Sequence, residues 1–145
     1  MALADLTKRL LALAETVHGW LGALSDLEGT RRDRVAAYAL AVADTLARAA
    51  EALSDVQACP GNQGARRRAM RELGRIAGYI ETIAAALSYD LDGRKLAGVK
   101  RRLLALRPAA RSDGPLPTLR ADRRHIERLV IAEGYFRALA DTLRA

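Results

Sequence analysis

The sequence has 145 residues, enough for one domain with a full core, and 50% of them are apolar while 28% are charged, which excludes a disordered chain. The apolar residues are mostly Ala and Leu, so the composition favours helices over strands. The formal net charge is +7, and all 24 basic residues except Lys8, Lys95 and Lys100 are arginines. Arginine suits bidentate contacts to phosphate and carboxylate, so the excess favours an anionic partner, although a GC-rich genome also produces Ala- and Arg-rich chains.

No feature of the sequence points to export, a membrane or a cofactor. Cys59 is the only cysteine, so no disulfide can form within the chain. Charged residues interrupt the N-terminal apolar run before a signal peptide could form, and no apolar stretch approaches the ~20 residues that a membrane span needs. We therefore expect a cytoplasmic protein with no bound cofactor.

The first predicted helix covers residues 3–27. Its apolar residues alternate at spacings of three and four, which places them on one stripe of a helix. The stripe consists of Leu3, Leu6, Leu10, Leu13, Val17, Trp20, Leu24 and Leu27. A turn is expected at Glu28-Gly29.

The second and third predicted helices are separated by a loop rich in Pro, Gly and Asn at residues 59–64. We expect the second helix to begin with Thr30 as its N-cap, and the third to begin near Ala65 and end near Leu91. The pair Gly74 and Gly78 on the third helix could let a neighbouring helix approach closely.

A short fourth helix is predicted over residues 96–106, followed by a Pro-containing loop, and the last helix is expected to begin near Thr118. No segment alternates like a strand. The sequence therefore predicts an all-α fold, an antiparallel up-and-down bundle of four long helices plus one short helix, forming a single domain over residues 1–145.

The positive charge gathers where predicted helices begin. In an up-and-down bundle the first, third and last helices begin at the same end. Cations there oppose the helix dipole, whereas free backbone N–H groups beside guanidinium groups suit an anion. The residues expected to bind nucleic acid phosphates are Arg66, Arg67, Arg68, Arg71, Arg120, Arg123 and Arg124. Some arginines could instead pair with Glu51, Asp55 or Glu72.

The aromatic residues indicate which kind of nucleic acid the chain would bind. Proteins that bind single strands usually supply stacking aromatics, and Trp20, Tyr38 and Phe136 look like core or near-core residues. The exceptions that could stack on bases are Tyr79, Tyr89 and Tyr135. Binding would then depend on phosphates and shape, as for structured RNA or a duplex. In size, charge and helicity the chain is similar to small bundle accessory proteins of diversity-generating reverse transcriptases and to helical small subunits of CRISPR effector complexes, although it carries no motif of either.

One catalytic motif has a counterpart here. Arg120 and His125 are separated by four residues, which resembles the Arg-x4-His motif of HEPN-type ribonucleases, small all-α bundles that usually dimerise to pair two motifs. The resemblance implies that Arg120 and His125 would act on the scissile phosphate. It covers six residues and the overall size, and Ala121 stands where that family usually has a polar residue.

The remaining candidates for chemistry have structural interpretations. His18, beside the first stripe, is expected to be a partly buried structural residue. Glu133 on the stripe of the last helix is expected to pair with an arginine or to lie at an oligomer interface. No His, Cys and carboxylate spacing fits a metal site.

The sequence thus favours a non-enzymatic nucleic acid-binding protein, with RNA favoured, as an accessory subunit of a nucleoprotein complex. It leaves open a HEPN-like ribonuclease, and also a protein-interaction adaptor that binds partner helices or acidic surfaces. A larger complex or a homo-oligomer remains open.

Overall fold

The computed structural model describes residues 3–86, 94, 97, 101 and 122–145. Over these residues the protein is all-α and contains no strand, which confirms the predicted helical bundle. The helices are α1 (Leu3–His18), α2 (Leu21–Ser25), α3 (Gly29–Ala58), α4 (Gln63–Ala86) and α6 (Arg123–Arg144). The predicted short helix at residues 96–106 lies outside the described residues, apart from Ala97 and Arg101, which are helical.

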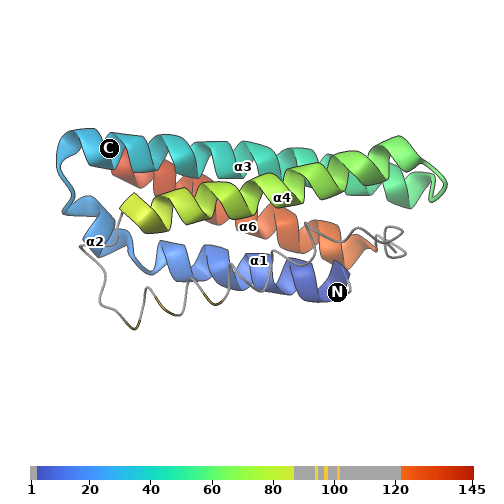
Figure 1. The fold of residues 1–145 in the computed structure, drawn as a ribbon, viewed down its shortest axis with the longest axis horizontal. Coiled ribbons are helices and arrows are strands. Elements are labelled where there is room, and N and C mark those ends of the chain that lie inside the picture. Colours follow the sequence, from blue (N-terminus) through green and yellow to red (C-terminus); the bar gives the residue numbers. More distant parts are fainter. Residues whose placement is uncertain (1–2, 87–93, 95–96, 98–100, 102–121) are drawn as a thin grey trace.

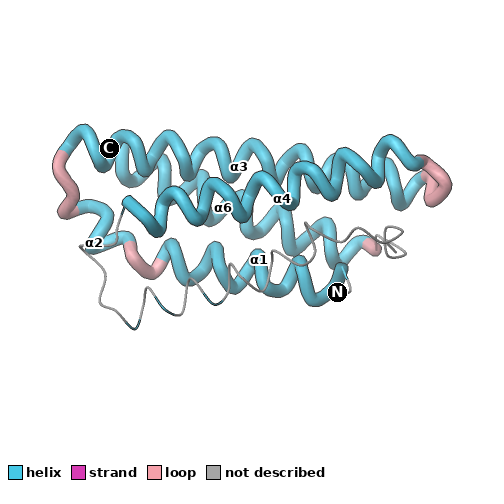
Figure 2. Tube along the Cα trace, viewed as in Figure 1, coloured by secondary structure: helices cyan, strands magenta, loops and turns pink. Residues whose placement is uncertain are grey.

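The long helices lie side by side in the order α4, α3, α6 and α1. α3 packs against both α4 and α6, and α1 packs against α6. α1, α4 and α6 begin at one end of the bundle, whereas α3 begins at the other end, near the C-terminus of the chain (Figures 1 and 2). The helix starts that carry the predicted phosphate-binding arginines therefore share an end of the molecule.

The predicted first helix is broken. α1 ends at His18, and the Trp20 N–H donates to the Val17 carbonyl oxygen at 3.0 Å in a tight turn before α2 begins. A Cβ at Gly19 would lie 3.2 Å from a backbone carbonyl oxygen, so glycine suits this turn. Trp20 and Leu24 are buried beyond the turn, so the spacing of the apolar residues continues across the break. For this reason the sequence pattern predicts one continuous helix.

The helix starts also differ from the expected ones. α3 begins at Gly29 after Glu28, whose side chain makes no capping bond, so the predicted Thr30 cap is wrong. α4 begins at Gln63, because the Asn62 side chain accepts a hydrogen bond from the Ala65 N–H at 3.0 Å. α6 begins at Arg123, because Asp122 before it is extended; the expected start near Thr118 is wrong.

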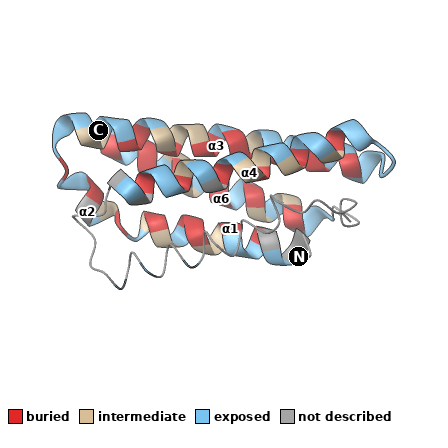
Figure 3. Cartoon of the chain, in the orientation of Figure 1, coloured by how far each residue is buried: buried red, intermediate tan, exposed pale blue. Residues whose placement is uncertain are grey.

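The buried residues form one hydrophobic cluster between the helices, visible as red bands facing inward (Figure 3). α3 lies at its centre and contributes several fully buried alanines, which let α4 and α6 approach it closely. They are Ala36, Ala39, Ala43 and Ala49. Trp20 and Phe136 are buried and Tyr38 is half-buried against the cluster, as expected.

Two further expectations concern single side chains. Glu133 is partly buried and pairs with Arg137 at 2.7 Å, which confirms its pairing with an arginine; Arg137 also reaches Asp44 of α3 at 3.2 Å. These contacts tie α6 to α3. Gly78 does not serve close helix packing, because it is exposed and a Cβ added there would meet no atom within 4 Å.

Candidate nucleic-acid interface

The α4 arginines begin one turn inside the helix rather than at its first residue. Because α4 starts at Gln63, Arg66 is its fourth residue. The dipole penalty falls off within the first turn, so the expected cost applies less to these arginines than to Arg123 and Arg124, which open α6. Ahead of the α4 arginines, the exposed Gln63 and Gly64 stand at the capped start of the helix.

The predicted α4 arginines differ in their exposure to solvent and in whether they pair with an acidic side chain. Arg68 donates to the Asp55 carboxylate of α3 at 3.0 Å. Arg66 is half-buried, and its Nε is enclosed without a hydrogen-bond partner. Arg67 and Arg71 are exposed, and neither forms an ion pair with a described residue. Of this group, Arg67 and Arg71 are therefore the side chains best placed to bind an external anion.

Arg67 and Arg71 belong to a row that the sequence prediction did not include in full. Arg75 follows at the same four-residue spacing, so the three guanidinium groups lie on one face of α4, about 6 Å apart along its axis. Arg75 donates to the Tyr79 hydroxyl at 3.0 Å and lies 5.8 Å from the centre of that ring. This hydrogen bond raises the pKa of Arg75 above its ordinary value, and Arg75 also pairs with Glu72 at 3.6 Å. The i, i+4 spacing was the signal that could have found Arg75.

The predicted residues near the last helix form a separate group. Arg123 pairs with Glu127 at 3.1 Å, whereas Arg124 is exposed and forms no ion pair with a described residue. Arg120 lies outside the described residues. α3 packs against both α4 and α6, so the two arginine groups share an end of the bundle but belong to different helices.

His125 has a structural role in the first turn of α6. It is buried, 9% exposed, and its Nδ1 accepts a hydrogen bond from the Asp122 N–H at 3.4 Å. In return the Asp122 carboxylate accepts a hydrogen bond from the Arg124 N–H at 2.6 Å. The pair forms a capping box that fixes the start of α6. His18 is half-buried and its ring packs edge-on against Tyr135 at 5.4 Å, in agreement with the expected structural role.

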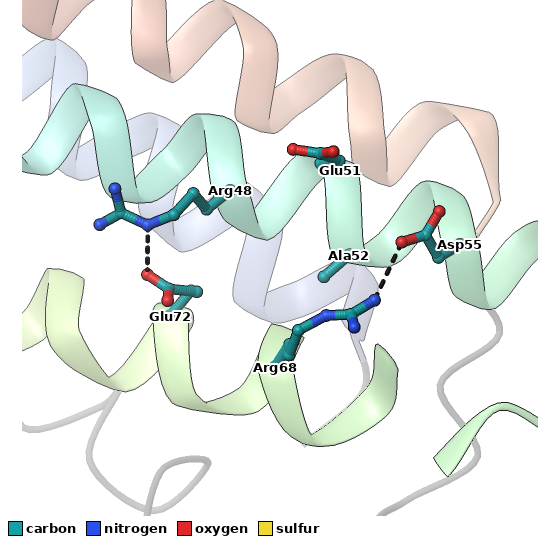
Figure 4. A pocket seen from close by; sticks show the side chains of 6 residues that line it. All are labelled: Arg48, Glu51, Ala52, Asp55, Arg68 and Glu72. Atoms are coloured by element: carbon teal, nitrogen blue, oxygen red, sulfur yellow. Dashed lines mark hydrogen bonds and ion pairs between the residues drawn. The ribbon is translucent and has the colours of Figure 1, made fainter. Parts of the chain in front are cut away.

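A surface pocket of about 380 Å³ lies between α3 and α4 (Figure 4). Two ion pairs cross it: Arg48 with Glu72 at 3.2 Å, and Arg68 with Asp55. Glu51 and Ala52 complete its lining. Because its guanidinium groups already contact carboxylates, the pocket is a poor anion site. The expected pairing of arginines with Asp55 and Glu72 is confirmed here.

The described residues include no group of three or more His, Cys, Asp or Glu side chains that could hold a metal ion. None of the described helices is long and apolar enough to cross a membrane. Cys59 is exposed just after α3 and forms no disulfide. No known family model, curated protein or solved structure matches this chain.

Proposed function

We propose that this chain is a non-enzymatic, basic helical-bundle protein that binds nucleic acid phosphates, RNA being favoured, as an accessory subunit of a nucleoprotein complex. The supporting observation is the pair Arg67 and Arg71, exposed on one face of α4 without an ion-pair partner among the described residues. Arg66 flanks this pair near the start of the helix. Guanidinium groups in such a row can each contact a different phosphate of one strand.

The described aromatic residues favour binding through phosphates and shape. Trp20 and Phe136 are buried, so they cannot stack on bases. Tyr79 is half-buried, lies 6.2 Å from the Tyr38 ring and accepts a hydrogen bond from Arg75. Because the described residues provide little stacking surface, contacts from them to bases would be few, and affinity would depend on salt far more than on sequence.

The test is fluorescence anisotropy of a labelled structured RNA against Arg67→Ala/Arg71→Ala protein over a salt series. We expect the variant to bind at least about tenfold more weakly than the wild type, because two charged hydrogen-bonding groups are lost. The slope of log K against log salt should become shallower by roughly 0.7–0.9 for each phosphate contact removed. A duplex DNA of equal length measures the preference for RNA.

The matched control is Arg34→Ala/Arg144→Ala. These exposed arginines lie near the start of α3 and the end of α6, at the opposite end of the bundle, and the double variant loses the same charge. We expect it to bind almost as well as the wild type. Equal losses in both double variants would show that only the net charge attracts RNA, and no binding at low salt would refute the proposed function.

The ribonuclease alternative is tested on the same samples by running the RNA on a denaturing gel. Intact RNA is expected, since His125 is buried and its Nδ1 serves the cap of α6. Cleavage that disappears in His125→Asn, in a variant with an unchanged circular dichroism spectrum, would instead favour the HEPN-like activity and reject the non-enzymatic proposal.

A further inference from the structure

The outward face of α6 carries an apolar patch. Val130 and Ile131 are 52% and 51% exposed, and they are the large apolar side chains most exposed to solvent in the described part of the chain. Gly134 and Ala138, also exposed, continue the same face toward the C-terminus. A Cβ added at Gly134 would meet no atom within 4 Å, so the space above this position is open. We call these four residues the α6 patch.

Charged side chains of opposite sign stand at the two ends of the α6 patch. Arg124 precedes it and Asp141 follows it; both are exposed, and neither forms an ion pair with a described residue. Arg124, Ile131 and Ala138 follow one another at seven-residue steps, as do Gly134 and Asp141, so both charges lie in line with the patch. The face is therefore positive at one end, apolar in the middle and negative at the other.

We infer that the α6 patch binds a second copy of this chain, with the two α6 helices antiparallel. A partner for this face needs an acid opposite Arg124 and a base opposite Asp141, and α6 itself provides both when it is reversed. In that register Ile131 sits over Gly134 of the second copy while Arg124 faces Asp141 of the second copy. A two-fold axis between residues 132 and 133 repeats both contacts, as a symmetric dimer requires.

Four physical effects set the strength of this dimer. Antiparallel helices bring opposite ends of their dipoles together, and Ile131 fills a gap left by the missing side chain of Gly134. The net charge of +7 on each copy opposes association. A contact limited to one pair of helices also belongs among the smaller interfaces. We therefore expect a weak dimer that forms as the protein concentration rises.

The test is sedimentation velocity of the full chain without nucleic acid, from about 1 to 300 µM at ~150 mM salt. The wild type should shift from monomer to dimer over this range. Ala138→Glu should remain monomeric, because its carboxylate would lie beside Glu127 of the second copy in the proposed register. Ala37→Glu, an equal change on the exposed face of α3, should dimerise like the wild type, apart from the effect of its altered net charge.

The register is tested by exchanging charges. Arg124→Asp and Asp141→Arg should each weaken the dimer at least about fivefold, and the double variant should recover most of the loss, since each pair is restored with its sign reversed. A wild type that stays monomeric throughout, or a dimer that Ala138→Glu leaves intact, would overturn the inference. Failure of the double exchange to restore association would overturn the antiparallel register. None of these results depends on nucleic acid binding.

Discussion

At the scale of single residues, the start of α6 depends on a reciprocal exchange of hydrogen bonds between Asp122 and His125. The hydrogen bond from the Arg124 N–H to the carboxylate lowers the pKa of Asp122 below its ordinary value of 3.8, and the nearby charge of Arg124 acts in the same direction. The charged carboxylate is thus favoured in the folded state. Asp122 therefore stabilises the protein at neutral pH and loses that contribution as the pH falls below the ordinary carboxyl range.

Replacing Asp122 with Asn should expose this pH dependence. Asn also caps helices well but carries no charge, so the wild type should have the higher melting temperature at pH 7. The difference should shrink as the pH falls from about 5 to 2.5, because the wild-type carboxylate becomes protonated. Thermal unfolding followed by circular dichroism measures this difference in melting temperature. A difference that stays constant over this range would contradict the role of the charge.

The sequence could predict some of these single-residue contacts and not others. Asp55 and Glu72 were recognisable as partners for arginines because the helices that carry them were predicted as neighbours. Which arginine pairs with each acid depends on the rotation of α3 against α4. In this arrangement Arg68 pairs with Asp55, whereas Arg67 and Arg71 have no ion-pair partner among the described residues. That rotation follows from side-chain packing between the helices, which the spacing along one helix does not describe.

At the scale of helices, an exposed glycine inside α4 lowers the free energy of unfolding of the protein relative to alanine. Gly78 is inside the helix, and an added Cβ would meet open space. Gly78→Ala should therefore raise the free energy of unfolding by about 0.5–1 kcal/mol, because alanine restricts the unfolded chain and favours the helix. Urea denaturation would show this as a higher midpoint with an unchanged slope.

Gly19→Ala is the matched control for Gly78→Ala. Its Cβ would lie 3.2 Å from the Thr16 carbonyl oxygen, in the turn between α1 and α2, so the same change should give no gain there or should destabilise. An equal gain at both positions would show that the break after α1 places no demand on its glycine. A loss at Gly78 would show instead that another part of the protein packs against this face of α4.

The helices themselves were predictable because three- and four-residue spacing of apolar side chains repeats along each of them. The residues at which these helices begin and end were harder to predict. The apolar spacing of the first predicted helix continues through Trp20 and Leu24 without interruption. Gly19 is therefore almost the only sign in the sequence of the turn after His18. The start of α4 at Gln63 could have been predicted from the capping side chain of Asn62, whereas Glu28 before α3 makes no capping bond that would mark the start of α3.

At the scale of the whole molecule, the helices share one hydrophobic cluster, and α3 connects α4 on one side to α6 on the other. Helices joined through one core are expected to unfold together rather than one by one. Ile80 of α4 is fully buried in this cluster, so Ile80→Ala should lower the free energy of unfolding by about 2–5 kcal/mol. The loss should affect the whole bundle, including elements that do not contain the substitution.

Trp20, the single tryptophan, allows this to be measured on a part of the chain that does not contain the substitution. It is buried between α1 and α2, whereas far-ultraviolet circular dichroism reports on all helices. In Ile80→Ala the fluorescence and dichroism curves in urea should coincide, with both midpoints shifted by the same amount, because the cavity weakens the core on which Trp20 also depends. If dichroism falls first while the Trp20 signal keeps its wild-type midpoint, α4 unfolds separately. The arginine row of α4 would then be carried by a helix that can detach from the rest of the bundle.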